Sequence, residues 1–295
     1  AGDIAGGELY GRGAVDMKGA IACFVAAAIA HLDDNGGKPR TGSLSLLITG
    51  DEEGPSINGT AKVLDWLGDR GEALDVCLVG EPTNPAALGD EIKIGRRGSL
   101  NARLVVHGRQ GHAAYPHLAD NPVPKLARMI ADLAGPLDEG VPYFAPSNLE
   151  VCVIGATSNV TNVIPGEAHA AFNVRYNTGH TRAGLEARLR EHCDKLAAEH
   201  GIDRYTLEFS GTGDAFLTEP GPFVDRVAGA VKTVTGRTPA LTTSGGTSDA
   251  RFIQACCPVV EFGLTNATIH AIDERTATAD LSALTAIYRR VLDHD

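Results

Sequence analysis

The sequence lacks any long apolar run. Its longest candidate is the alanine-rich segment Ala20–Ala30, well short of the roughly 20 residues that a membrane helix needs. The first residues, AGDIAGGELYGRG, have neither the basic start nor the apolar stretch of a signal peptide. The six cysteines show no spacing typical of a disulfide framework. These absences predict a protein of the reducing cytoplasm with no membrane partner.

Positive charge is also scarce. Lys and Arg number 26 against 37 Asp and Glu, which gives a formal net charge of −11. Nucleic acids and anionic membranes favour clustered Lys and Arg, so we expect neither as a partner. An anionic small substrate is compatible with this balance, because a few arginines inside a cleft outweigh a diffuse surface charge that salt screens over about 10 Å.

The chain of 295 residues, 43% of them hydrophobic, is long enough to bury a sizeable core. Nearly continuous apolar runs at Ser43–Thr49 and Leu74–Val79 predict strands buried on both faces of a mainly parallel sheet. Helical patterns at Gly19–Leu32 and Thr60–Leu67 alternate with these strands. The first part of the chain therefore predicts an α/β domain.

The pattern changes after the glycine-rich GRRGS, Gly95–Ser99. The expected elements that follow are strands at Leu100–His107, Leu149–Ile154, Ala168–Arg175 and Tyr205–Ser210, with helices at Pro122–Leu133 and Arg182–His200. Their order, β-α-β-β-α-β, is ferredoxin-like. From Phe223 the first pattern returns, with a helix to Val234, a strand at Val259–Phe262 and a closing helix at Leu281–Leu292. We expect residues 1–97 and 212–295 to form one α/β domain, interrupted by a smaller domain at residues 98–211.

Four side chains that suit a metal ion follow apolar runs or glycine-rich turns: Asp16, Glu53, Glu81 and His270. The last three lie in TGDEEG, VGEPT and NATIH, each after an expected strand, where open α/β sheets bind ligands. Taken singly, Asp16 has an alternative role as a helix cap, Glu53 as a solvated turn acid and His270 as a packed loop histidine. Together, carboxylate oxygens and an imidazole favour a divalent ion such as zinc.

Eight motifs carry a resemblance to a known family. They are GRGAVDMKG, TGDEEG, VGEPT, GRRGS, GHAAYPHLADNP, NVIPGE, SGGTSDARF and NATIH. Their order resembles that of the M20 metallopeptidases, and the match runs through essentially the whole chain. The resemblance implies a zinc-exopeptidase-like catalytic domain interrupted by a ferredoxin-like dimerisation domain, within a homodimer.

The resemblance also implies an activity. GHAAYPHLADNP and GGTSDARF are most similar to the branch that removes succinate from N-succinyl-LL-2,6-diaminopimelate in lysine and diaminopimelate biosynthesis. The alternative within the family is another deacylation, such as that of acetylornithine, or dipeptide cleavage. In either case the expected enzyme is a metal-dependent hydrolase of a linear amide.

For the metal centre, the resemblance implies that Asp16 bridges two zinc ions, with Co²⁺ as a substitute. Glu53 and His270 would complete one site, and Glu81 would bind the other ion. Glu52 would act as the general base that takes a proton from the attacking water.

For the substrate, the resemblance implies that His112 reaches the active site of the partner subunit and stabilises the oxyanion. Arginine forks pair well with substrate carboxylates. The positions that would grip substrate are Arg96, Ser99, Tyr115, Asn162, Arg175, Thr247, Arg251 and Asn266. For Arg175, an exposed position on a strand face is the alternative.

One family feature is missing. M20 members carry a His-x-Asp pair upstream of GRGAVDMKG, and this sequence contains no such pair there. His31-Leu32-Asp33 has the right letters but lies downstream, at the end of an expected helix, so we interpret it as a decoy. We therefore expect an N-terminally truncated catalytic domain in which Glu81 lacks its imidazole partner and at most one zinc binds tightly. A truncated, non-catalytic relative is the remaining alternative.

Overall fold

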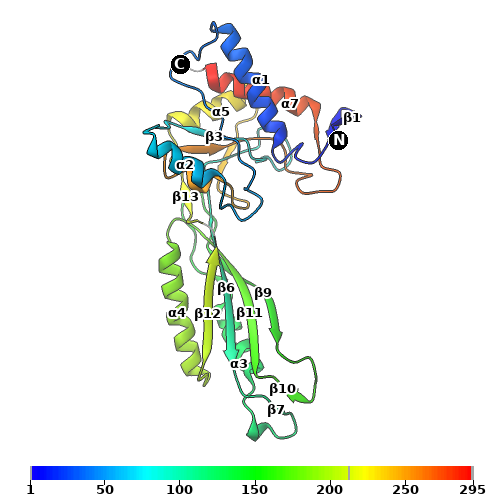
Figure 1. The fold of residues 1–295 in the computed structure, drawn as a ribbon, viewed down its shortest axis with the longest axis vertical. Coiled ribbons are helices and arrows are strands. Elements are labelled where there is room, and N and C mark those ends of the chain that lie inside the picture. Colours follow the sequence, from blue (N-terminus) through cyan, green and yellow to red (C-terminus); the bar gives the residue numbers. More distant parts are fainter. Residues whose placement is uncertain (1, 212, 294–295) are drawn as a thin grey trace. The chain divides into compact units, whose positions relative to one another are not determined.

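The chain divides into two units, one comprising the residues up to Arg96 and from Leu217 onward, the other Arg97–Phe216 (Figure 1). The computed structural model describes residues 2–211 and 213–293. The expected domain boundaries were 97/98 and 211/212; residue 212 and the chain ends at 1 and 294–295 lie outside the described residues. No helix in the described ranges is long and apolar enough to cross a bilayer.

Helices form much of the first unit. They are α1 (Lys18–Asp34), α2 (Thr60–Asp69), α5 (Pro222–Thr235), α6 (Ala250–Ile253) and α7 (Thr278–Asp293). Helix α1 packs on α7, and α7 on α5 (Figure 1). Small side chains on α1, such as Ala20 and Ala27, are fully buried and allow this close packing. Helix α5 begins with a proline and ends at Gly236, whose φ of 73° closes the last turn.

The first unit has a mixed sheet rather than a mainly parallel one. Its order is β14 (Ala240–Thr242), β4 (Glu91–Lys93), β15 (Val259–Glu261) and β3 (Cys77–Val79). The outer pairs are parallel, and β15 runs antiparallel to β4. The predicted strand at Ser43–Thr49 is wrong, because this segment pairs with no strand of the described residues and leaves Leu46 50% and Ile48 61% exposed.

A second small sheet brings distant segments together. Its strands are β1 (Asp3–Ala5), β2 (Glu8–Tyr10) and β16 (Arg275–Ala277), all antiparallel. Tyr10 lies opposite Arg275. The loop that follows β2 and the loop that precedes β16 therefore meet at the same end of this strand pair. A further two-stranded sheet consists of β5 (Gly95–Arg96) and β13 (Phe216–Leu217).

The second unit has the predicted β-α-β-β-α-β order with one short additional strand, β8, after the first helix. Its main elements are β6 (Gly98–His107), α3 (Pro122–Leu133), β8 (Gly135–Pro136), β9 (Asn148–Ala156), β11 (Glu167–Tyr176), α4 (Arg182–Glu199) and β12 (Tyr205–Gly211). The antiparallel sheet runs β12-β6-β11-β9-β8. Alternate residues of β11 are buried, from Ala168 to Tyr176, and share one core with both helices. Side chains of Asn121 and Thr181 cap α3 and α4.

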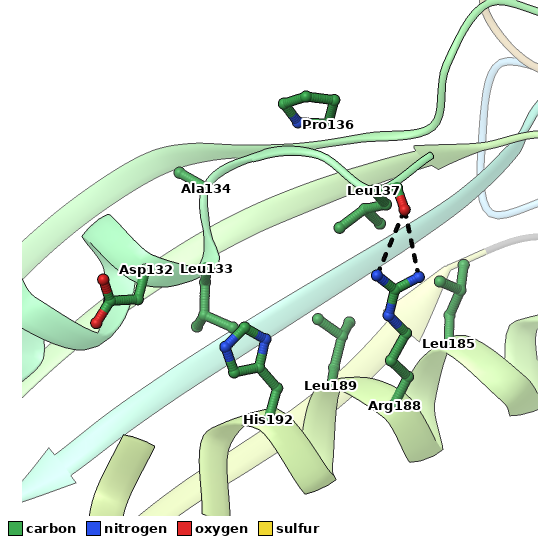
Figure 2. Close-up of a pocket in the computed structure, with 9 residues that line it drawn as sticks. All are labelled: Asp132, Leu133, Ala134, Pro136, Leu137, Leu185, Arg188, Leu189 and His192. Carbon is green, nitrogen blue, oxygen red and sulfur yellow. Dashed lines mark hydrogen bonds between the residues drawn. The ribbon is translucent and has the colours of Figure 1, made fainter. Parts of the chain in front are cut away.

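A small cavity of about 130 Å³ lies between the end of α3 and α4 (Figure 2). Its lining is mixed, with apolar side chains such as Leu133, Leu185 and Leu189 beside the polar side chains of Asp132, Arg188 and His192. Arg188 closes one side by donating two hydrogen bonds to the carbonyl oxygen of Leu137, both at 3.4 Å. None of the site residues expected from the sequence lines this cavity.

Candidate active site

Three of the predicted metal ligands meet in the first unit. Potential ligand atoms of Asp16, Glu53 and His270 all lie within 4.8 Å of one another. The Nε2 atom of His270 is 2.7 Å from Oε1 of Glu53 and 3.3 Å from Oδ2 of Asp16. A hydrogen bond from the imidazole to Glu53 is the largest cause that raises the pKa of His270. Two carboxylates and an imidazole make a donor set that suits zinc.

The backbone at His270 is unusual. Its φ of 56° lies in the left-handed region, which costs a non-glycine residue about 1–3 kcal/mol. The surrounding loop, which runs from β15 to β16, must hold this conformation. Such a backbone places the imidazole of His270 against Asp16, which lies just before α1.

The acidic side chains repel one another in the absence of a cation. Burial, followed by repulsion from Glu53, raises the pKa of Asp16. Burial, followed by Asp249, raises the pKa of Glu52 to about 7. Burial, followed by Glu261, raises the pKa of Glu81 to about 9. A bound divalent cation would offset these penalties, so the residues present fit such an ion.

The loop that carries Glu52 and Glu53 is organised by its neighbour Asp51. Oδ2 of Asp51 accepts hydrogen bonds from the amides of Ile57, at 2.6 Å, and Asn58, at 2.9 Å. The carboxylate of Asp51 therefore shapes the turn through Oδ2. Glu53 is exposed and Glu52 is partly buried, so the two adjacent acids differ in surroundings.

Glu81 lies two residues beyond the end of β3, at the carboxyl end of the strand, as expected. It is not a member of the three-residue cluster found among the described residues. His31, the expected decoy, is buried on α1, where its Nδ1 lies 2.7 Å from Oδ1 of Asp293. This contact holds His31 against the last residue of α7, and His31 is not a member of the metal cluster.

Arg96 is engaged inside the protein. Its guanidinium donates through Nε, at 2.9 Å, and Nη2 to the carboxylate of Glu261, and through Nη1 to the carbonyl oxygen of Gly246, at 3.0 Å. Ser248 donates to Glu261 at 2.8 Å. Arg96 and Glu261 therefore support the loop that carries Thr247, rather than presenting a free fork to solvent.

Arg251 and Asn266 lie in the same unit. Arg251 is buried on α6; its Nη2 donates to Oγ of Ser56 at 2.9 Å, and its Nε has no hydrogen-bond partner within the described ranges. Asn266 lies between β15 and His270, and its amide donates to the carbonyl oxygen of Asn84 at 2.9 Å. Arg251 thus retains unused hydrogen-bonding capacity next to the loop of Glu52.

The second unit carries the other expected residues, in two groups. Ser99 on β6 lies opposite Arg175 on β11. Burial, followed by nearby Arg97, lowers the pKa of Arg175. Arg175 is partly buried and lies on the face of β11 that alternates with the fully buried one.

His112, Tyr115 and Asn162 form the other group. Strand β7 (Gly111–His112) pairs with β10 (Val163–Ile164), and the amide of Ala113 donates to the carbonyl oxygen of Asn162 at 2.9 Å. The rings of His112 and Tyr115 lie 5.7 Å apart, and both side chains are exposed. Nδ1 of His112 accepts the amide hydrogen of Ala114 at 3.0 Å, which leaves Nε2 to carry the proton.

Comparison with known proteins places this geometry in a family. The model of peptidase family M20/M25/M40 matches residues 1–294. The chain belongs to this family. M20 membership makes the chain a hydrolase of amides that uses a divalent metal.

Relatives of this M20 chain are similar over nearly its full length. It is 56% identical over 295 residues to the succinyl-diaminopimelate desuccinylase of Methylorubrum extorquens, covering 99% of this chain and 76% of the relative. It is 58% identical over 293 residues to the enzyme of the same name from Rhodospirillum centenum, covering 99% and 74%.

Solved structures show the same fold. The aminopeptidase PepT of Bacillus cereus matches with a TM-score of 0.80 at 21% identity, over 98% of this chain and 74% of that one. An M20 metallo-carboxypeptidase of Sulfolobus solfataricus matches with a TM-score of 0.71 at 16% identity, over 99% and 78%.

Sequence reasoning on this M20 chain missed several acids that shape the site. Asp51, Asp249, Glu261 and Glu274 were assigned no role, although Asp51 and Asp249 lie inside quoted motifs. Glu274 is buried, yet its pKa is lowered, because the amides of Asp16 and other residues outweigh the effect of burial. The one sequence signal for Glu274 was its position four residues after His270, and a solvent-exposed acid at that position would give the same signal.

Proposed function

We propose that this chain is a zinc-dependent hydrolase that converts N-succinyl-LL-2,6-diaminopimelate and water to succinate and LL-2,6-diaminopimelate. The cluster of Asp16, Glu53 and His270, with Glu52 beside it, carries the proposal. Relatives that are 55–58% identical and are named succinyl-diaminopimelate desuccinylase support the choice of substrate. The LL-2,6-diaminopimelate that is released would enter a diaminopimelate and lysine pathway.

In this proposal Asp16, Glu53 and His270 hold one divalent ion, and Glu81, which lies outside this cluster, is a candidate ligand of a second ion. A bound ion would polarise the amide carbonyl and make water more acidic. We expect one tightly held zinc per chain, since the three-ligand cluster is the group that the described residues bring together. Metal analysis that finds two tightly held zinc ions would contradict this assignment.

Glu52 is the proposed general base. Its carboxylate is partly buried one residue from the ligand Glu53, and it is not a member of the ligand cluster. A carboxylate beside the ligands can take a proton from the attacking water and pass it to the leaving nitrogen of diaminopimelate. Loss of Glu52 should therefore impair turnover and leave metal binding largely intact.

Substrate carboxylates need cationic partners. The proposed partners are Arg251 and Arg175. The Nε of Arg251 has no hydrogen-bond partner among the described residues, and burial lowers the pKa of Arg175, an effect that a bound carboxylate would offset. Ser99, Tyr115, Asn162, Thr247 and Asn266 are proposed to contact the substrate as neutral donors or acceptors. Arg96 acts in this proposal through the Thr247 loop that it supports.

His112 is the proposed stabiliser of the oxyanion, acting in the partner subunit of a homodimer formed through the second unit. Its exposed Nε2–H is a donor already held in the required tautomer by the amide of Ala114. We also propose a cytoplasmic location, which the six free cysteines support.

The substrate is tested by assaying the zinc-loaded chain in parallel with N-succinyl-LL-2,6-diaminopimelate and acetylornithine. We expect succinate release to exceed acetate release in kcat/KM by at least about 100-fold, because a site that matches several substrate carboxylates discriminates by a few kcal/mol. Faster acetate release would favour the acetylornithine alternative. Zinc binding without turnover of either substrate would favour a non-catalytic relative.

The role of His112 in the partner site is tested by subunit mixing. Inactive Glu52→Gln and His112→Ala chains, unfolded and refolded together, should recover about a quarter of wild-type activity, because half of the dimers contain one intact site. The same chains refolded separately are the control. If mixing restores nothing, His112 does not act in the partner subunit.

A further inference from the structure

Glu274 lies next to the metal cluster without belonging to it. Its side chain is only 1% exposed. Oε2 accepts the amide hydrogen of Gly13 at 2.7 Å, while Oε1 accepts those of Val15, at 2.9 Å, and Asp16, at 3.0 Å. One buried carboxylate thus holds the backbone of the segment that ends in the ligand Asp16.

Further contacts join the same two segments. Arg12 donates from Nη1 to Oε2 of Glu274 at 3.1 Å and from Nη2 to the carbonyl oxygen of Ala271 at 3.1 Å. The amide of Gly11 donates to the carbonyl oxygen of Glu274 at 2.9 Å. Residues 11–16 are therefore bound along their length to residues 271–274, which directly follow His270.

We propose that Glu274 is a positioning residue of the metal centre, which sets the separation of Asp16 and His270 by holding the backbone of one ligand loop to the other. This rests on the metal centre of the proposed function. Asp16 and His270 come from opposite ends of the sequence, and the pairing of Tyr10 with Arg275 aligns the strands but not the loops beyond them. Glu274 supplies that missing link.

The carboxylate is required in this role because both of its oxygens accept. A glutamine of the same size presents an NH₂ group to amide donors on one side, so at least one backbone N–H loses its partner. An aspartate keeps the charge but is one methylene shorter. The two substitutions therefore separate the geometry of the contact from the charge near the ion.

The test measures zinc affinity calorimetrically on metal-free protein, without substrate. Glu274→Gln should weaken the zinc Kd by about 10–100-fold, the range typical for loss of a partner that orients ligands. Glu274→Asp should weaken it by an intermediate factor. Amide hydrogen exchange at Gly13, Val15 and Asp16 should become faster. Glu8→Gln, which breaks the neighbouring pair with Arg275, is the matched control and should bind zinc like the wild type.

The outcomes are distinct. A folded Glu274→Gln chain whose zinc Kd lies within twofold of the wild type overturns the proposal. If that chain fails to fold, Glu274→Asp decides, because wild-type affinity in this variant would mean that charge rather than geometry matters. If zinc binding is weakened in Glu274→Gln as expected, but the zinc-loaded wild type releases no succinate, only the proposed substrate is refuted. A wild type that binds no zinc refutes both proposals.

Discussion

The buried pair of Arg96 and Glu261 should be among the most sensitive points of the first unit. The side chain of Glu261 is 1% exposed, and its oxygens accept from two nitrogens of Arg96 and from Ser248. The substitution Glu261→Gln removes the charge and leaves the Arg96 guanidinium buried without its counterion. Breaking a buried pair in this way costs about 3–5 kcal/mol of unfolding free energy.

The expected change is measurable by guanidinium unfolding and by heat. A loss of 3–5 kcal/mol corresponds to a fall of about 6–20 °C in Tm for a unit of this size. Replacing both partners, as in Arg96→Met with Glu261→Leu, should cost only about 1–2 kcal/mol. Neither charge of the pair is then left buried alone, and the only other losses are the hydrogen bond that Arg96 donates to Gly246 and the one that Ser248 donates to Glu261. Glu8→Gln breaks an exposed pair and should cost less than about 1 kcal/mol.

The double variant also separates stability from function. Because Arg96 supports the loop of Thr247 through Gly246, the double variant should keep its fold and show a raised KM for the proposed substrate. The reasoning is refuted if Glu261→Gln loses less than about 1 kcal/mol, or if the double variant is as unstable as the single one.

Three further predictions concern other sites. Asp138→Ala should lower the unfolding free energy of the second unit by about 3 kcal/mol, because the carboxylate accepts from Gly140, Ser147, Asn177 and His180. Since these donors hold the pKa of Asp138 far below its ordinary value despite burial, the stabilisation is fully present above that value and is lost as the pH falls towards the lowered pKa, so the difference between variant and wild type in unfolding assays should start to narrow only below about pH 4 and shrink further as the pH falls. Glu52→Gln should reduce kcat by about 10²–10⁴-fold with zinc content unchanged, and reduced zinc content would instead make Glu52 a ligand. Chelation should abolish succinate release, and zinc or cobalt should restore it; activity that survives complete removal of metal would exclude the proposed mechanism.

Much of the fold was predictable because it rests on local periodicity. The helix predicted at Pro122–Leu133 is observed with the same bounds, and the alternation on β11 follows from its sequence. The prediction of a strand at Ser43–Thr49 was wrong for a physical reason. An apolar run forms a strand only when a neighbouring strand accepts and donates the hydrogen bonds of its backbone. Strands β4 and β14 were missed because three residues carry too little pattern to be recognised.

The candidate site divides in the same way. The sequence by itself determined the donor types, since Asp16, Glu53 and His270 stand in motifs whose chemistry is local. Only the tertiary structure decided which side chains meet, and it assigned Arg96 to Glu261 and the Asp16 loop to Glu274. A buried acid and a solvated one are the same letter in the sequence, and the long-range hydrogen bonds that distinguish them exist only once the chain has folded.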